Sequence, residues 1–364
     1  MGTIQDLRVA LKSRFAERNA VIDGLLVALI SRETCFILGS PGTAKSAVCE
    51  AITGAIGGTY FQWLLTKFTT PDEVYGPPSF TGLKSDRCER VTTGKLPEAS
   101  VAFIDEIFKG SSAIINTLLP VINERKFFNG TSTQSVPLET FYCASNEIPQ
   151  AEELAALYDR LTLKFEVKRL SGGAFRSFIT KDFLKVQIPT LDKGELEKAR
   201  KATETVTIPD NVLNAIASIA GELEQSGIYV SDRKWFKIIE VLKAYSVLNG
   251  ATEVAEDDLE IVAHCAWHTP DQFKTVEKIV NKFSNPLGET LLQHRDNLDE
   301  VVALLDSGKL NAVEGHKKAL DCAKALKALA GKHPANRKVA ETFTYAQAAV
   351  AKITKEKLGI DLSI

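Results

Sequence analysis

The sequence lacks the features of a membrane protein, a disulfide-rich secreted protein or a zinc protein. None of its six cysteines forms a C-x-x-C pair, and none has metal-ligand spacing with the five histidines. The longest apolar stretch, 20–30, is interrupted by Asp23 and Gly24 and is too short to span a bilayer, so we predict an amphipathic helix. No cationic start precedes an apolar segment at the N-terminus, so we expect no signal peptide. These absences favour a cytoplasmic protein with reduced thiols and no membrane insertion.

A strong charge of either sign is also absent. The formal net charge is -2, so there is no global basic field that would attract nucleic acid or anionic lipid. Three basic residues at Lys84, Arg87 and Arg90 alternate with Asp86 and Glu89, which is typical of a solvated surface. A nucleic-acid partner is therefore not expected. With 364 residues, of which 45% are hydrophobic, the chain is long enough for two or three domains.

The first half alternates strand-like with helix-like segments. The strand-like segments are Thr34–Gly39, Thr59–Leu65, Val101–Asp105 and Phe141–Ser145. Helical segments such as 46–55 and 111–124 lie between them. This alternation predicts an α/β fold in which helices cover both faces of a parallel sheet. Two stretches interrupt it, 80–97 and 126–139, and we predict both to be inserted hairpins, the second turning at Asn129-Gly130.

The second half is predicted to be helical. Apolar residues recur at helical spacing from Val212 to Leu223 and from Trp235 to Leu242. In the last helix the apolar residues follow a 4-3-4-3 pattern, which favours an intramolecular hairpin or bundle; they are Val339, Phe343, Ala346, Val350 and Ile353. We expect three domains: an α/β core at 1–185, a small helical domain at 186–284, which we call the lid, and a C-terminal helical extension at 285–364.

A phosphate-binding loop is the strongest functional signal. It follows a predicted strand, opens a predicted helix and consists of Gly39, Ser40, Pro41, Gly42, Thr43, Ala44, Lys45 and Ser46. Backbone N–H groups and the helix N-terminus would surround anionic oxygens. Lys45 would reach the β- and γ-phosphates, and Ser46 would ligate Mg²⁺. Ala44 stands where the consensus has glycine, so a positive φ at that position would be costly.

Further candidates stand at the ends of later segments. Asp105 and Glu106 end an apolar strand, where Asp105 would hold Mg²⁺ through water and Glu106 would polarise the attacking water. Asn146 ends another strand and could contact the γ-phosphate, although asparagine is also a common turn residue. Arg160 could act as an arginine finger, and Arg233 could reach the phosphates of its own subunit, but most arginines are solvated surface groups.

These residues resemble the MoxR branch of AAA+ ATPases, and within it the RavA type. The segments that carry the resemblance are GSPGTAKS at 39–46, LLTKFTTPDEVYGP at 64–77, GKLPEASVAFIDEIFK at 94–109, NTLLPVINERKFFNG at 116–130, ASNEIP at 144–149, ALYDRLTLKFEV at 156–167 and YVSDRKW at 229–235. The likeness extends to about residue 285. Alanine is usual in this branch at the position of Ala44.

The resemblance implies a role for each matching position. Lys45 and Ser46 resemble the Walker A pair, and Asp105 and Glu106 resemble the Walker B acids. Asn146 resembles sensor 1, Arg160 the trans-acting finger and Arg233 sensor 2. The insertions at 80–97 and 126–139 resemble the helix-2 insert and the pre-sensor hairpin. The family implies ATP with Mg²⁺, a hexameric ring and a partner of von Willebrand factor A type that has a metal-ion adhesion site.

One departure from the RavA type is large. RavA has a β-rich module in its C-terminal region that binds a metabolic decarboxylase, whereas here about eighty residues follow the lid and all are predicted helical. We do not expect that partner. A protein remodeller is the leading hypothesis, and a nucleic-acid translocase or a nucleotide-gated scaffold on the same core are the alternatives. The sequence contains no guanine-reading motif that we can identify, so the preference for ATP depends on the family.

Overall fold

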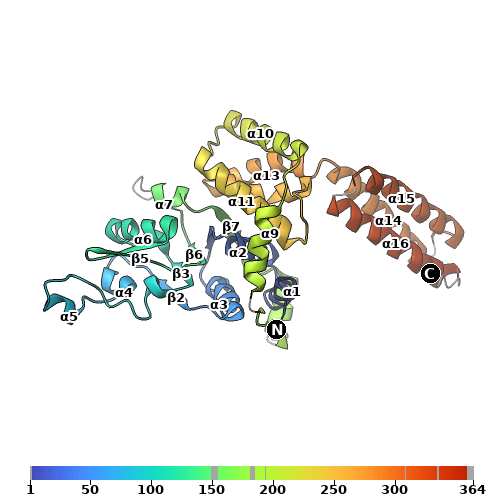
Figure 1. Cartoon of the computed structure of the whole chain (residues 1–364). Helices are drawn as coiled ribbons and strands as arrows, with labels where there is room; N and C mark the ends of the chain where they lie inside the picture. The colour runs from blue at the N-terminus through green and yellow to red at the C-terminus, as the bar shows by residue number, and fades with distance from the viewer. Residues whose placement is uncertain are drawn as a thin grey trace. The chain divides into compact units, whose positions relative to one another are not determined.

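The structure is a computed structural model that describes residues 2–148, 155–180, 185–192, 194–307, 309–333 and 336–358. The chain forms two compact units (Figure 1). The first comprises Met1–Ile208, Ala220–Val254 and Ile261–Val276, and the second comprises Pro209–Ile219, Ala255–Glu260 and Glu277–Ile364. The helices of the expected lid are thus divided between the two units, and the expected domain boundaries stay predictions. No helix in the described ranges combines the length and apolarity that crossing a membrane requires.

A five-stranded parallel sheet forms the centre of the first unit. Its strands, in chain order, are β1 Thr34–Gly39, β2 Tyr60–Leu64, β3 Val101–Asp105, β6 Thr140–Ser145 and β7 Leu163–Val167. Their spatial order is β2-β3-β6-β1-β7. All carboxyl ends therefore meet at one edge of the sheet, which we call the carboxyl edge, and all amino ends meet at the opposite amino edge. The predicted α/β class with a parallel sheet is confirmed. The strand β7 was not among the predicted strand-like segments.

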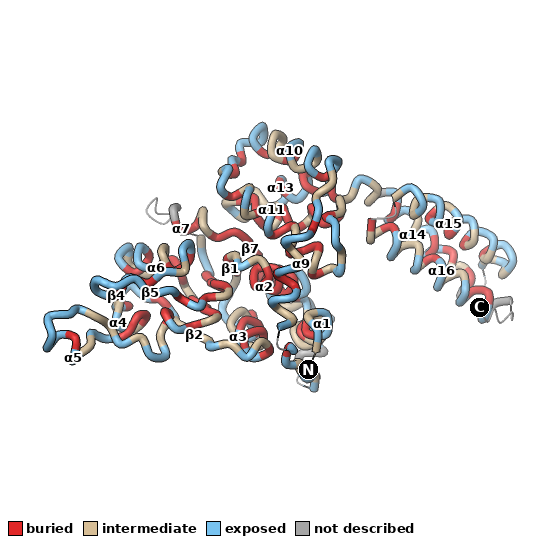
Figure 2. The backbone as a smooth tube through the Cα atoms, in the orientation of Figure 1, coloured by how far each residue is buried: buried red, intermediate tan, exposed pale blue. Residues whose placement is uncertain are grey.

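One face of the sheet is covered by α2 Asn19–Ser31 and α3 Lys45–Ile56, and α1 Ile4–Arg14 packs against both of these helices. Helix α2 is buried at every position from Val21 to Ile30 (Figure 2), so the predicted amphipathic helix is wrong. It is buried all round because its one acid, Asp23, forms ion pairs with Arg8 and Lys12, both at 2.7 Å. Gly24 lets the ring of Phe165 approach, since a Cβ there would lie 2.1 Å from the ring.

The other face of the sheet is covered by α4 Pro71–Tyr75 and α6 Ser112–Glu124. Alternate residues of the strands, such as Phe36, Ile104 and Phe141, pack there against apolar residues of these helices, among them Tyr75 and Leu118. Residues on a strand alternate between faces, and both faces of this sheet are apolar. A strand in such a sheet is buried on both faces, so every residue of Val101–Ile104 is apolar.

The two insertions differ in structure. The predicted hairpin at 126–139 is confirmed as the antiparallel pair β4 Lys126–Asn129 and β5 Ser132–Ser135. The predicted hairpin at 80–97 is wrong, because that stretch contains a short helix, α5 Phe80–Leu83, and a 3-10 turn at Leu96–Glu98. The strand pairing next to α5 is limited to one isolated antiparallel bridge, between Pro78 and Arg90. Proline has no N–H to extend such a ladder. Instead Ser79 caps α5.

The described residues beyond 170 form helices, with no strand longer than an isolated bridge. These helices are α8 Gly172–Ile179, α9 Glu195–Thr205, α10 Asp210–Gln225, α11 Asp232–Leu248, α12 Ala263–Ala266 and α13 Pro270–Ser284, with a 3-10 segment η5 at Glu256–Val262. The short helix α7 Ala155–Asp159 precedes strand β7. The predicted helical second half is confirmed.

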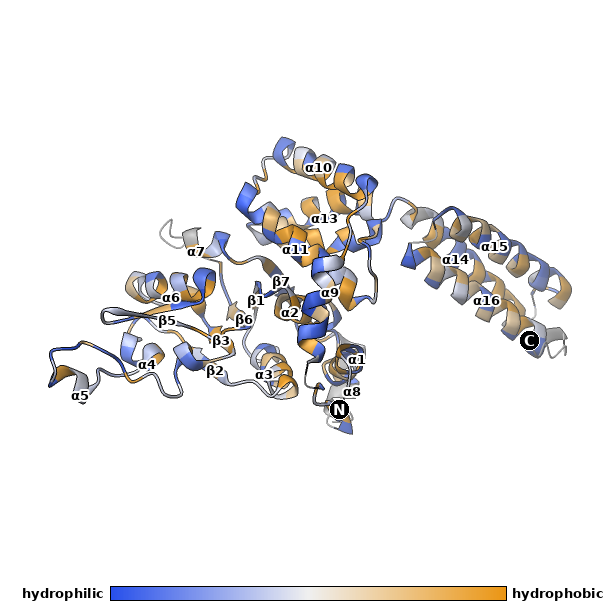
Figure 3. Ribbon diagram, in the orientation of Figure 1, coloured by the Kyte–Doolittle hydropathy of each residue, from blue (hydrophilic) through white to orange (hydrophobic). Residues whose placement is uncertain are grey.

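Three long helices form a bundle in the second unit: α14 Gly288–Asp306, α15 Ala312–Lys332 and α16 Arg337–Leu358. Polar and apolar residues alternate along each of them (Figure 3). Of the five residues of the 4-3-4-3 pattern, Val339, Ala346 and Ile353 are buried in the bundle core and the other two pack against it, so the predicted intramolecular bundle is confirmed. At the start of α16 the guanidinium of Arg337 forms ion pairs with the buried carboxylates of Asp257 and Asp258.

Candidate functional site

The phosphate-binding loop lies at the carboxyl edge, between the end of β1 at Gly39 and the start of α3 at Lys45. Gly39 packs so closely on β7 that a Cβ would lie 2.6 Å from the carbonyl oxygen of Val167. Gly42 has a positive φ of 78°. The Lys45 amine donates to the carbonyl oxygens of Gly39 at 2.6 Å and Ser40 at 3.1 Å. The lysine therefore lies over the loop, where it can meet an anion held by the loop's N–H groups.

Ala44 has φ 65° and ψ 22°. This is the left-handed conformation, which costs free energy for a residue with a side chain. The side chain of Ala44 is exposed, so Ala44→Gly removes little packing. Because an L-residue loses about 1–2 kcal/mol in this region, we expect the substitution to stabilise the protein by up to about 1 kcal/mol after the larger unfolded-state entropy of glycine is subtracted. Chemical denaturation measures the change.

Gly57 provides a matched control for this prediction. It ends α3 with φ 65° and ψ 26°, and a Cβ there would meet nothing within 4 Å. Gly57→Ala should therefore destabilise the protein by a similar amount, since it adds the strain that Ala44→Gly removes. Two changes of the same sign would contradict the interpretation.

The two acids lie at the end of β3. Glu106 also has a positive φ, 51°, and its N–H donates to Oδ1 of Asp105 at 3.0 Å. Strained backbone of this kind is common at functional sites. Oε2 of Glu106 is buried and accepts no hydrogen bond within the described chain, although the Lys109 amine lies 3.3 Å away in an ion pair. The carboxylate is thus available to a further donor, such as a water molecule.

Lys45 and these acids share one electrostatic environment. Burial lowers the pKa of Lys45, and the charges of Asp105 and Glu106 act in the opposite direction. Strand β6 lies between β3 and β1 in the sheet, so Asn146, which follows the end of β6 and is exposed, stands between the two acids and the loop. The sheet order therefore brings Lys45, Asp105, Glu106 and Asn146 to one edge.

This arrangement fits a nucleotide with a divalent cation. The loop offers N–H donors and the Lys45 cation to phosphate oxygens, and Ser46 and Asp105 offer the hydroxyl and carboxylate oxygens that Mg²⁺ prefers. Mg²⁺ is commonly held by one or two carboxylates together with substrate phosphates. A site of this kind needs no cluster of three acidic, histidine or cysteine ligands, and the described residues contain none.

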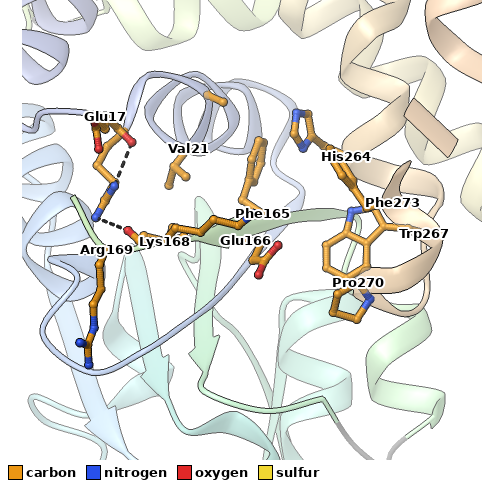
Figure 4. A pocket seen from close by; sticks show the side chains of 13 residues that line it. Glu17, Val21, Phe165, Glu166, Lys168, Arg169, His264, Trp267, Pro270 and Phe273 are labelled. Atoms are coloured by element: carbon orange, nitrogen blue, oxygen red, sulfur yellow. Dashed lines mark hydrogen bonds between the residues drawn. The ribbon is translucent and has the colours of Figure 1, made fainter. Parts of the chain in front are cut away.

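A pocket of about 320 Å³ lies next to the loop (Figure 4). Its aromatic wall is formed by Phe165, His264, Trp267 and Phe273, and the rings of Phe165 and His264 stack at 4.3 Å. Arg18 joins the pocket to the loop, because its guanidinium donates to the carbonyl oxygens of Thr43 at 3.3 Å and Lys168 at 2.8 Å. The sequence analysis did not predict this pocket, because its walls come from three separate stretches of the chain.

The two candidate arginines lie at the amino edge. Arg160 lies three residues before Leu163, the first residue of β7, and the hydroxyl of Thr34, the first residue of β1, donates to its carbonyl oxygen at 2.8 Å. Arg233, at the start of α11, donates to Oδ2 of Asp159 at 2.5 Å. The six residues of β1 separate this edge from the phosphate-binding loop, a span of roughly 20 Å. This location differs from the expectation that Arg233 reaches the phosphates of its own subunit.

Two buried lysines contact residues that flank Arg160, and one of them, Lys234, belongs to helix α11. Lys164 is 0% exposed and donates to the carbonyl oxygen of Trp267 at 2.5 Å, and its amine lies 4.2 Å from the centre of the Tyr158 ring. Lys234 is 1% exposed and donates to the carbonyl oxygen of Leu161 at 3.4 Å. Burial lowers the pKa of both amines, and the charge of Lys234 lowers that of Lys164 further. The sequence analysis did not predict that either lysine is buried.

The lowered pKa of Lys164 predicts a pH-dependent stability difference. The unfolded lysine, with a pKa near 10.4, binds more protons than the folded one, so its unfavourable contribution disappears as the pH rises toward that value. We expect the free energy of unfolding of the wild type to rise relative to that of Lys164→Met between neutral pH and pH 10, by at most about 1.4 kcal/mol per pH unit. Denaturant titrations at a series of pH values measure it.

The comparison with Lys164→Met is necessary because other buried groups act in the opposite direction. Burial raises the pKa of the thiols of Cys35, Cys49, Cys143 and Cys265, which lowers stability in alkaline solution. The contributions of Cys35, Cys49 and Cys143 are common to both proteins and cancel in the difference, whereas that of Cys265 cancels only in part, because the charge of Lys164 lowers its pKa. A difference that does not change with pH would mean that Lys164 keeps its proton throughout.

Comparisons with known proteins agree with this geometry. Residues 2–202 match the family model of the MoxR domain in the MoxR-vWA-beta-propeller ternary systems, and residues 211–280 match a model of an AAA lid domain. Two uncharacterized proteins of Methanocaldococcus jannaschii are each 36% identical to the chain. The match to the first covers 85% of the chain and 83% of that protein, and the match to the second covers 86% of the chain and 86% of that protein.

Two more distant likenesses point the same way. The chaperone MoxR1 of Mycobacterium tuberculosis is 24% identical over 37% of the chain and 35% of that protein. The crystal structure of a candidate ATPase from Cytophaga hutchinsonii superposes with a TM-score of 0.62 at 17% identity, covering 77% of this chain and 93% of that one. At this identity the structural likeness supports the fold alone.

Proposed function

The chain belongs to the MoxR family of AAA+ ATPases, and we propose that it hydrolyses ATP at sites that a neighbouring subunit completes, in order to remodel or activate a protein partner. The observation that carries the proposal is the meeting of Lys45, Asp105, Glu106 and Asn146 at the carboxyl edge. A scaffold that binds the nucleotide without hydrolysing it would not need the buried carboxylate oxygen of Glu106, which can accept a hydrogen bond from water. The family matches do not favour a nucleic-acid motor.

Each residue of the carboxyl edge has a chemical task in this proposal. The loop N–H groups and Lys45 hold the phosphates, Ser46 and Asp105 would hold Mg²⁺, and Glu106 takes a proton from the attacking water. Bound Mg²⁺ would neutralise charge that develops on the phosphate oxygens. Asn146 orients the water or the γ-phosphate through its amide. The aromatic pocket beside the loop has the size and the stacking surfaces for a purine base.

Arg160 and Arg233 act together on the nucleotide of the next subunit. Both belong to the amino edge, on the far side of the sheet from the loop of their own chain, and the Asp159 carboxylate holds Arg233 next to Arg160. Cations supplied across an interface stabilise the negative charge of the transition state. The proposed assembly is a ring, hexameric by family resemblance, in which every site needs two subunits.

The proposed partner is a protein of von Willebrand factor A type. The support is the description of the matching family model, which names such proteins in ternary systems with the MoxR domain. Together with the distant likeness to a chaperone, this favours a partner-directed ATPase over a metabolic one. We propose that the protein acts in the cytoplasm.

The proposal is tested by measuring the ATP hydrolysis rate against protein concentration, with particle mass determined in the same samples. We expect the rate per subunit to rise as a larger species forms in the presence of ATP. Lys45→Ala is the control, because it removes the cation that holds the phosphates. A rate per subunit that is constant from monomer to oligomer would contradict sites built at an interface.

A further inference from the structure

The residues Asp159–Thr162, which we call the finger segment, are fixed through their backbone. The hydroxyl of Thr34 donates to the carbonyl oxygen of Arg160 and accepts from the N–H of Thr162, both at 2.8 Å. The N–H of Arg160 donates to the carbonyl oxygen of Leu157 at 2.9 Å. Since these bonds act on the main chain, they set the position from which the Arg160 side chain extends.

Glu33 connects this segment with helix α11. Its Oε2 accepts from the Thr162 hydroxyl at 2.7 Å and from the Lys237 amine at 2.7 Å. The side chains of Glu33 and Lys237 are only 15% and 25% exposed. Charge-assisted hydrogen bonds with this little solvent contact are stronger than exposed ion pairs.

Three residues on α11 contact the finger segment or its support. Arg233 binds the Asp159 carboxylate, Lys234 binds the carbonyl oxygen of Leu161, and Lys237 binds Glu33. Residues 233 and 237 stand one helical turn apart on the same face. The first two turns of helix α11 therefore contact the finger segment and Glu33, and Glu33 is the charged centre of that contact.

We infer that Glu33 and Lys237 are positioning residues, which hold the finger segment so that Arg160 and Arg233 can reach the nucleotide of a neighbouring subunit. The inference rests on the proposed function, since only an arginine that acts across an interface needs to be held at the amino edge. Neither residue lies at the carboxyl edge. A subunit that lacks them should therefore fail to supply its arginines to the neighbouring site, which is its role as a donor. Its own nucleotide site, which receives arginines from the other neighbour, should stay intact.

Mixed assemblies separate these two roles. Glu106→Gln subunits cannot hydrolyse ATP but keep their finger, and Arg160→Ala subunits lack the finger but keep their acids. Mixed before ATP is added, the two should regain activity that neither has alone. Adding Glu33→Gln to the Glu106→Gln donor should lower the regained rate about tenfold, whereas adding it to the Arg160→Ala receiver should change the rate less than about twofold.

Lys237→Met provides a second variant that keeps a long apolar stem in place of the ion pair. It should reproduce the donor defect, and the combination of Glu33→Gln with Lys237→Met should be no worse than either alone. Glu314→Gln, which removes an exposed ion pair on α15, is the matched control. Particle mass and ATP binding are measured for each mixture.

The outcomes are distinct. A donor-specific loss with both variants supports the positioning role. Equal losses in donor and receiver, or no loss in either, would overturn it. If Glu106→Gln and Arg160→Ala subunits do not restore each other even though they assemble together, the trans-acting finger itself is wrong, and the positioning role falls with it.

Discussion

Replacing Glu106 by glutamine should lower the ATP hydrolysis rate at least about a hundredfold while ATP binding stays within about twofold. The amide has nearly the shape of the carboxylate, so the positive φ at this residue and the phosphate-binding loop are retained. What is lost is the base that takes a proton from water. The steady-state hydrolysis rate and the dissociation constant of ATP, measured on the same preparation, check the two halves of the prediction.

A second consequence follows for assembly. Because the nucleotide is bound but not consumed, the ATP-bound oligomer should persist for as long as ATP is present, and gel filtration with ATP should show it. Glu124→Gln is the matched control, since Glu124 forms an exposed ion pair with Lys126 away from the carboxyl edge. A Glu106→Gln protein that hydrolyses ATP at close to the wild-type rate would exclude this carboxylate as the base.

Replacing Arg160 by alanine should lower the hydrolysis rate of the assembled protein about a thousandfold or more, in the range found for arginine fingers. Arg160 lies at the amino edge, so ATP binding at the carboxyl edge of the same chain should be unaffected. The backbone bonds from Thr34 do not involve the side chain, so the finger segment keeps its position. Rates at a protein concentration that saturates assembly, together with ATP binding, measure the effect.

Arg295→Ala is the control for this substitution, because it removes a guanidinium that stacks on Tyr345 within the C-terminal bundle. It should leave hydrolysis unchanged. If Arg160→Ala weakened ATP binding as strongly as it lowered the rate, the guanidinium would act on its own subunit's nucleotide. Full activity of the assembled variant would remove Arg160 from the site.

Local signals explain why much of the carboxyl edge was predictable. The phosphate-binding loop and the Asp105-Glu106 pair each follow a strand whose apolar run is visible in the sequence, and parallel strands bring their ends together. The hairpin of β4 and β5 turns at Gly130 and Thr131, one residue beyond the predicted Asn129-Gly130, because Asn129 pairs with Ser132. These features depend on neighbours within a few residues, so a single sequence contains them.

Features that depend on distant contacts were not predictable. The strand β7 was missed because Lys164 and Glu166 give it the look of a surface segment, whereas Lys164 is buried by residues of the lid. Helix α2 was expected to have a polar face, because Arg8 and Lys12, which neutralise Asp23, lie on another helix. The position of Arg233 at the amino edge and the aromatic pocket likewise arise from packing between segments far apart in sequence.

The opposite placement of the phosphate-binding loop and the two arginines has a consequence for stoichiometry. If a subunit completes only its neighbour's site, contacts between subunits are head-to-tail, and such contacts either close into a ring or continue as an open chain. A monomer then has no complete site, and an open chain always has one site fewer than it has subunits. Closure adds the one missing site, so a closed ring has a higher rate per subunit than an open chain of the same number of subunits.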